Sequence, residues 1–104
     1  MSFLRAALTV FAVVISIPAQ AAEFHKFDRA AFDAAQAQRR PILIDAAASW
    51  CPVCASQDHT IKRTATAREY EKLIVFRIDY DGHKPERKAF GVTRQATLIW
   101  LRGR

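Results

Sequence analysis

Hydrophobic and polar positions along this chain change period several times, and each change predicts a boundary between secondary-structure elements. Residues 24–27 alternate apolar and polar side chains, which is typical of a short strand. Residues 28–38 place apolar side chains at helical spacing behind Asp28, a favourable helix cap. Residues 42–44 are all bulky and apolar, which predicts a strand that is buried on both faces.

The rest of the chain continues this alternation after a helix that carries both cysteines. The expected elements are a short helix from Thr64 or Thr66 to Lys72, a strand over 73–80, a turn at Asp81 and Gly82, a helical turn over 85–90 and a last strand over 96–101. The resulting order, β-α-β-α-β-α-β, predicts an α/β fold with a mixed sheet and helices on both faces.

The N-terminal segment has a different character from the rest. Arg5 precedes an apolar run, and Ala19 and Ala21 supply the small residues that permit cleavage after Ala21 or one residue later. We therefore expect a secretory signal peptide over 1–22 and a single domain over 23–104. The alternative is a retained membrane anchor, although the apolar run is shorter than the ~20 residues of a spanning helix. Export predicts the bacterial periplasm, where disulfides form and persist, and no membrane contact after cleavage.

The charge distribution narrows the classes of partner. The formal net charge is +6, from 16 basic and 10 acidic residues. The bases are scattered and interleaved with acids, whereas nucleic-acid binders concentrate them in a stripe or a known module. We therefore expect a mildly basic solvated surface and no nucleic-acid partner.

The only two cysteines, Cys51 and Cys54, follow the apolar strand at Cys-x-x-Cys spacing. A helix that begins here places the first sulfur at its N-terminus, where unpaired N–H groups favour a thiolate. Cys51 is therefore the predicted nucleophile, and Cys54, one helical turn later, the resolving thiol. The alternative is a structural disulfide, but a crosslink across so short a loop adds little stability.

This stretch resembles the active-site segment of the thioredoxin superfamily. The resemblance rests on Arg40, Pro41, the apolar strand, Asp45, Trp50, Cys51 and Cys54. It implies a thioredoxin-like thiol–disulfide oxidoreductase without a cofactor, which acts on protein disulfide or dithiol substrates and exchanges electrons with a redox partner. Thioredoxins normally add a fifth strand and a final helix, so we expect a fold that is C-terminally incomplete and has an exposed edge at its last strand.

The resemblance also implies roles for single residues. Asp45 would be the buried acid beneath Cys54, where burial raises its pKa and suits it to accept the Cys54 proton. An acid that faces water or pairs with a base is the alternative. Trp50 would pack beside the dithiol and contribute to substrate docking. Val53 stands where strong oxidants carry a histidine, which argues against an extreme oxidising potential.

One position departs from the family. Where thioredoxins have a cis-proline opposite the dithiol, this chain has Ala96, preceded by Gln95. A cis bond before a non-proline residue costs ~3 kcal/mol, so we expect a trans peptide and a changed backbone at these two substrate-binding residues.

The absent proline leaves two other functions open. An open dithiol could bind metal, copper above all, with Cys51 and Cys54 as thiolate ligands and His59 or His83 as further ligands. No second Cys-x-x-Cys completes a closed metal site, however. A third possibility is an incomplete thioredoxin fold that serves only as an interaction partner.

Overall fold

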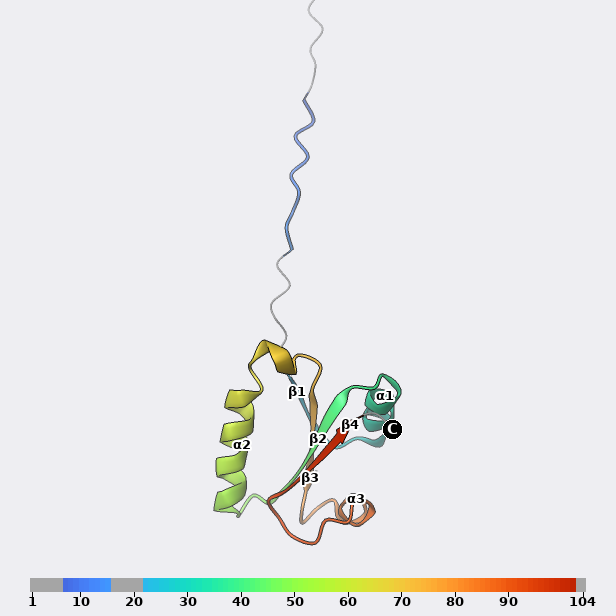
Figure 1. Cartoon of the computed structure of the whole chain (residues 1–104), viewed down its shortest axis with the longest axis vertical. Helices are drawn as coiled ribbons and strands as arrows, with labels where there is room; N and C mark the ends of the chain where they lie inside the picture. Colours follow the sequence, from blue (N-terminus) through green and yellow to red (C-terminus); the bar gives the residue numbers. More distant parts are fainter. Residues whose placement is uncertain (1–6, 16–21, 103–104) are drawn as a thin grey trace, which may run out of the picture.

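A computed structural model describes residues 7–15 and 22–102. Residues 7–15 contain no helix or strand and extend away from the domain (Figure 1). Most of the predicted signal peptide, and the cleavage point after Ala21, lie outside the described residues. None of the helices that the structure describes is long and apolar enough to cross a membrane.

Strands and helices alternate through residues 22–102 in the predicted order (Figure 1). The elements are β1 (Glu23–Lys26), α1 (Arg29–Ala37), β2 (Pro41–Ala47), α2 (Pro52–Thr64), the 3₁₀ turn η1 (Arg68–Tyr70), β3 (Ile74–Asp79), α3 (Lys84–Ala89) and β4 (Thr97–Arg102). The predicted cap of α1 is confirmed, because Asp28 Oδ2 accepts the N–H of Ala31 at 2.9 Å.

The predicted helix between α2 and β3 is wrong in extent. Thr64 is the last residue of α2 and caps nothing. The hydroxyl of Thr66 donates to the carbonyl of Arg63 at 2.7 Å, so it faces back toward α2 and does not cap a new helix. The 3₁₀ turn Arg68–Tyr70 begins after Ala67, which has no side chain to cap it. A single turn therefore replaces the expected helix.

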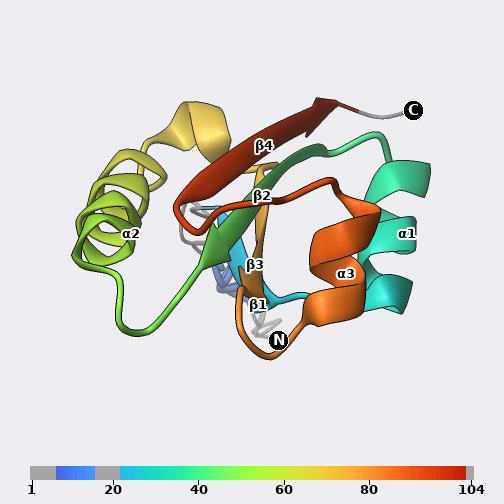
Figure 2. The same cartoon turned by 90° about the horizontal axis from the view of Figure 1, so that it is seen from below.

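The sheet is mixed, as predicted, with strand order β1-β3-β2-β4 in the described part of the chain. β1 and β2 run parallel to β3, and β4 runs antiparallel to β2 (Figure 2). In this register Asp45 of β2 lies beside Arg77 of β3 on one side and Leu98 of β4 on the other. The topology therefore brings together a carboxylate and a guanidinium that are far apart in sequence.

One face of the sheet carries the larger core. α1 and α3 lie on this face, and α2 lies on the other (Figure 2). Four phenylalanines from separate elements pack here with ring centroids 5.4–5.9 Å apart, mostly edge to face, which favours aromatic pairs. They are Phe27, Phe32, Phe76 and Phe90. This core holds α1 and α3 firmly against β2 and β3.

The face beneath α2 is covered less completely. Leu43, Leu73 and Val75 are buried against α2 and η1. A groove of about 190 Å³ remains between α2 and β4, with Trp100 in its wall. β4 is the end strand of the described sheet, and its outer side chains Leu98 and Trp100 stay 43% and 54% exposed. The expectation of an exposed edge at the last strand is met.

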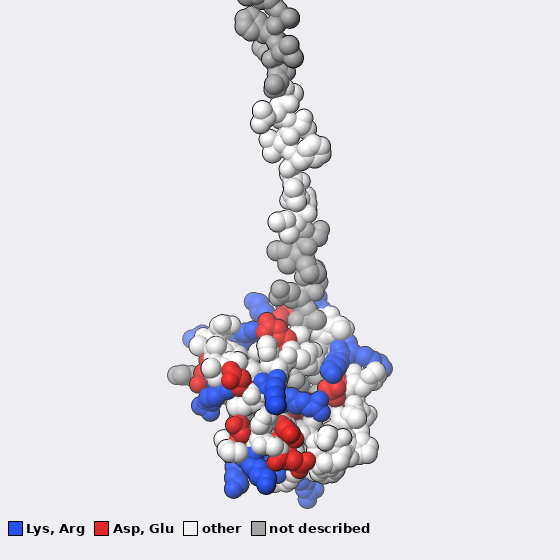
Figure 3. All heavy atoms as spheres, turned by 180° about the vertical axis from the view of Figure 1, so that it is seen from behind, with Lys and Arg blue, Asp and Glu red and all other residues white. Residues whose placement is uncertain are grey.

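Charged residues of both signs are mixed on the face of the molecule drawn in Figure 3. Several form ion pairs, such as Lys62 with Asp58 at 2.9 Å along α2 and Arg40 with Glu23 at 3.3 Å. This pattern agrees with the mildly basic solvated surface that the sequence indicates.

Candidate active site

The dithiol lies where the buried strand β2 leads into α2. Cys51 is the N-cap of α2 and has the extended backbone typical of that position, with φ −95° and ψ 110°. Its Sγ accepts the N–H of Cys54 at 3.1 Å, one of the amide groups that a helix start leaves unpaired. Pro52 occupies the first turn, where a missing N–H costs nothing. The predicted placement of the first sulfur at a helix N-terminus is therefore observed.

The two sulfurs differ in burial. Cys51 is 6% exposed and Cys54 only 1%, and both are free thiols. Burial raises the pKa of the Cys54 thiol, and both the hydrogen bond to Cys51 and the charge of Cys51 raise it further. The backbone amides of Ala48 and Ala96 lower the Cys54 pKa. Cys54 is therefore the inner sulfur, and its burial is the main cause of its raised pKa.

Asp45 is buried in the middle of β2, with 3% of its surface exposed. Desolvation raises the pKa of its carboxyl, and nearby Asp58 adds to the shift, while the positive charges of Arg77 and Lys62 oppose it. Its Oδ1 is buried without a hydrogen-bond partner. The raised pKa that the sequence predicts is thus found. Neither cysteine is among the groups that shift the Asp45 pKa, so its role as acceptor of the Cys54 proton stays a prediction.

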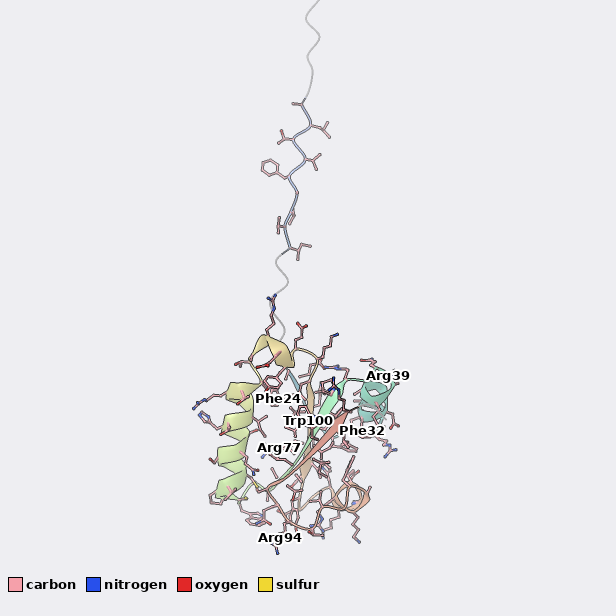
Figure 4. The ribbon with its side chains drawn as sticks, in the orientation of Figure 1. Phe24, Phe32, Arg39, Arg77, Arg94 and Trp100 are labelled. Carbon is pink, nitrogen blue, oxygen red and sulfur yellow. The ribbon has the colours of Figure 1, made fainter. Side chains whose placement is uncertain are left out.

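A hollow of about 520 Å³ on the α2 side of the sheet reaches Asp45. Its lining mixes apolar and charged side chains, and the charged ones include Asp58 and Lys62 from α2, with Arg77 and Asp79 from β3. Figure 4 shows Arg77 between the sheet and α2, on the side opposite Phe32. Asp45 therefore lines this hollow although only 3% of its own surface is exposed.

Trp50 precedes the dithiol and is 58% exposed. Its indole Nε1 donates to Asp81 Oδ2 at 2.7 Å, which ties the ring to the turn after β3. The backbone N–H of Asp81 in turn donates to Asp79 Oδ1 at 3.2 Å. Trp50 is therefore a large, exposed and fixed aromatic ring next to Cys51 in the sequence, and its role in substrate docking stays a prediction.

Gln95 and Ala96 lie in the loop before β4, and both are half-buried. The peptide bond between them is trans, as expected, because no cis peptide occurs in the described residues. Ala96 packs against the cluster that contains Cys51 and Cys54. Its backbone has φ +59°, a left-handed conformation that is unfavourable for a residue with a Cβ. The structure therefore places Ala96 opposite the dithiol in a backbone conformation that proline cannot adopt.

The copper-binding alternative requires further ligands beside the dithiol. His83 lies after β3, where its Nδ1 accepts the N–H of Asp79 at 3.0 Å, and His59 is exposed on α2. Within residues 7–15 and 22–102, no group of three or more His, Cys, Asp or Glu side chains is arranged to hold a metal ion.

Sequence reasoning missed three residues at this site. In the sequence Arg77 is one of several scattered basic residues. Its position inside an apolar strand is the signal that could have indicated a pairing with Asp45. Asp81 was assigned only to a turn. Gln57, whose Nε2 donates to the Ala96 carbonyl at 3.4 Å, gave no signal, since the contact spans 39 residues.

Comparisons with known proteins agree with this geometry. The thioredoxin family model matches residues 23–103. Thioredoxin-1 of Drosophila yakuba is 32% identical over 81 residues, which cover 77% of this chain and 68% of that protein. The crystal structure of Trxlp from Edwardsiella tarda is 35% identical with a TM-score of 0.75, and the match covers 77% of this chain and 78% of that one.

A more distant solved structure, the thioredoxin of Malassezia sympodialis, supports the fold alone. It is 14% identical with a TM-score of 0.68, over 80% of this chain and 72% of that one. The fold and the paired cysteines together define a thioredoxin-fold protein with a Cys-x-x-Cys pair. The chain belongs to the thioredoxin family of thiol–disulfide oxidoreductases. The predicted α/β thioredoxin-like fold is confirmed.

Proposed function

We propose that this protein reduces or exchanges disulfides of other proteins in the bacterial periplasm. The observation that carries the proposal is the hydrogen bond from the Cys54 N–H to the Sγ of Cys51. It aims a helix N-terminus at the outer sulfur, where a negative charge is stabilised. The inner sulfur, 1% exposed, is then placed to resolve and not to attack.

The reaction follows from these positions. The Cys51 thiolate attacks one sulfur of a substrate disulfide, a Cys51–substrate disulfide forms, and the other substrate sulfur leaves as a thiolate. Cys54 then loses its proton and attacks the Cys51 sulfur. The Cys51–Cys54 disulfide forms and the second substrate thiolate leaves. Two electrons have passed to the substrate, and a dithiol-bearing redox partner restores the reduced pair.

Neighbouring residues support the two steps. Asp45, with its raised pKa and its access to the hollow, accepts the Cys54 proton and releases it to solvent. Trp50 and the loop at Gln95 and Ala96 lie around the dithiol and contact the substrate chain. The apolar exposed ring of Trp50 favours an unfolded or extended segment over a small thiol.

The proposal is tested by the reduction of insulin with dithiothreitol as electron donor, followed by turbidity. The purified chain should accelerate precipitation of the reduced insulin chains, and Cys51→Ser should not. The copper-binding function would be supported instead by two results together. The unmodified chain would not accelerate insulin precipitation, and it would bind Cu(I) in a way that Cys51→Ser and Cys54→Ser each abolish.

The periplasmic location rests on the leader over 1–22. When the full chain is expressed in a bacterium, we expect it in the periplasmic fraction with an N-terminus at Ala22 or Glu23. A protein that keeps Met1 and stays with the membrane fraction would show that the leader is an anchor.

A further inference from the structure

The backbone at Ala96 is held in an unfavourable conformation directly against the dithiol. Its φ of +59° is one of two positive values at non-glycine positions in the described residues. An alanine adopts this conformation only when surrounding contacts fix it. Ala96 packs on the cluster that contains Cys51 and Cys54. A contact that holds the Ala96 backbone in place therefore also holds the loop that packs against the two sulfurs.

Gln57 supplies a contact that fixes this loop. It lies on α2 three residues after Cys54, and positions three apart share a helix face. Its Nε2 donates to the Ala96 carbonyl at 3.4 Å. This bond joins the helix that carries the dithiol to the loop that covers it.

Packing alone does not explain an amide side chain at this position. The Oε1 of Gln57 is buried and has no hydrogen-bond partner. A buried acceptor without a partner destabilises the folded state, and a leucine of similar size would avoid that cost. The feature that a leucine lacks is the Nε2 donor that binds the Ala96 carbonyl.

The loop contacts the cysteine cluster at Ala96. The Ala96 amide lowers the pKa of the Cys54 thiol, against the upward effect of burial. A proline at this position would have no N–H and could not do so. At the position of the family's proline, Ala96 therefore keeps a backbone N–H in the loop that packs against the resolving sulfur.

We propose that Gln57 is a positioning residue, which holds the Ala96 carbonyl and thereby keeps the backbone of this loop packed against Cys54. The inference deepens the proposed function, on which it rests. In the resolving step the Cys54 proton leaves to the acceptor, Cys54 forms the bond to Cys51, and the substrate sulfur departs. Gln57 touches none of these reacting atoms and acts only through the loop.

The test measures the ionisation of Cys54 directly. In a Cys51→Ser background a single thiol remains, and its thiolate is followed by ultraviolet absorbance against pH and by the rate of alkylation. We expect Gln57→Leu to raise the Cys54 pKa and to slow alkylation at neutral pH about threefold or more, in proportion to the lost thiolate. Gln57→Met, which is also without a donor, should act in the same direction and is available if the leucine variant does not fold.

The control is Gln36→Leu on α1, the same substitution on the opposite face of the sheet. It should leave the Cys54 titration unchanged. A Gln57→Leu protein with reduced thermal stability and an unchanged or lowered Cys54 pKa would overturn the proposal, because it would show a purely structural role. The readout requires no turnover, so it stays valid even if the chain fails to reduce insulin. Failure of the two proposals can therefore be told apart.

Discussion

The backbone N–H of Cys54 donates to the Sγ of Cys51 over 3.1 Å, so the second cysteine anchors the first at the start of α2. Residues 51–54 therefore contain an outer sulfur, on Cys51, that faces a helix N-terminus and an inner sulfur, on Cys54, that is 1% exposed. This asymmetry assigns different chemistry to two identical side chains.

The first prediction concerns the order of the two cysteines. Cys54→Ser should trap a covalent disulfide between Cys51 and a substrate protein, because nothing then resolves it. Cys51→Ser should trap almost none, since Cys54 is buried. Non-reducing gel electrophoresis followed by peptide mapping identifies the linked cysteine. Preferential alkylation of Cys54 over Cys51 in the unmodified protein would reverse the assignment.

The second prediction concerns the proton acceptor. Asp45→Asn should slow the resolving step by about tenfold or more and leave the initial attack nearly unchanged. Mixed disulfide should therefore accumulate in rapid-quench experiments. Asp33→Asn is the matched control, because Asp33 pairs with Arg29 on α1, on the other face of the sheet. Equal slowing of both steps, or none, would remove Asp45 from the mechanism.

The third prediction is the pH dependence of stability that Asp45 creates. The pKa of the Asp45 carboxyl is raised in the folded state, so the folded protein binds this proton more tightly than the unfolded chain does. The ionised carboxylate therefore destabilises the folded state. Asp45→Asn should then raise the free energy of unfolding at neutral pH, on the order of 1 kcal/mol. The gain should appear as pH rises above about 3.9, the ordinary aspartate pKa, and reach its full value above the raised pKa.

Denaturant titrations of both proteins across this pH range measure the difference. Below about pH 3.9 the carboxyl is protonated in both states, so the two unfolding curves should converge. A difference that is constant with pH would mean that the amide changes packing and not charge.

The fourth prediction concerns the tie between Trp50 and Asp81. Asp81→Asn replaces a carboxylate by a neutral amide as acceptor of the 2.7 Å bond from Trp50 Nε1, and neutral acceptors form weaker hydrogen bonds. The substitution should lower the free energy of unfolding by about 1 kcal/mol. The freed indole should show lower fluorescence anisotropy, measured in a Trp100→Phe background so that one tryptophan reports. Asp33→Asn, whose acid pairs with Arg29 on α1, is the control and should not change the signal. An unchanged anisotropy in Asp81→Asn would show that packing alone holds the ring.

The fifth prediction concerns the backbone at Ala96. Ala96→Gly should stabilise the protein by about 1 kcal/mol, because glycine adopts φ +59° without a steric penalty. Ala96→Pro should destabilise it, since the ring fixes φ near −65° and removes the N–H. Ala34→Gly, inside α1, is the matched control and should lose about 1 kcal/mol. Thermal unfolding of the three variants gives the signs, and a less stable Ala96→Gly would contradict the observed backbone.

The sequence by itself determined the local features of this protein. The apolar run before Cys51 and the spacing to Cys54 predicted a buried strand that delivers a dithiol to a helix N-terminus, and Asp28 predicted the start of α1. These features depend on periodicity, capping and turn chemistry, which act over a few residues. The helix expected between α2 and β3 is a wrong prediction, because it too rested only on local capping residues. Either of two threonines could have served as a cap, and the sequence does not show that Thr66 turns back to bind Arg63.

Only the tertiary structure decided which distant groups surround the dithiol. Arg77 faces Asp45 because parallel pairing sets the register of β2 and β3, and Gln57 meets Ala96 because β4 returns antiparallel beside β2. Such contacts depend on strand order and register, which the packing of the whole sheet fixes. The cysteines reveal the chemistry in the sequence, but the groups that surround them come together only when the chain folds.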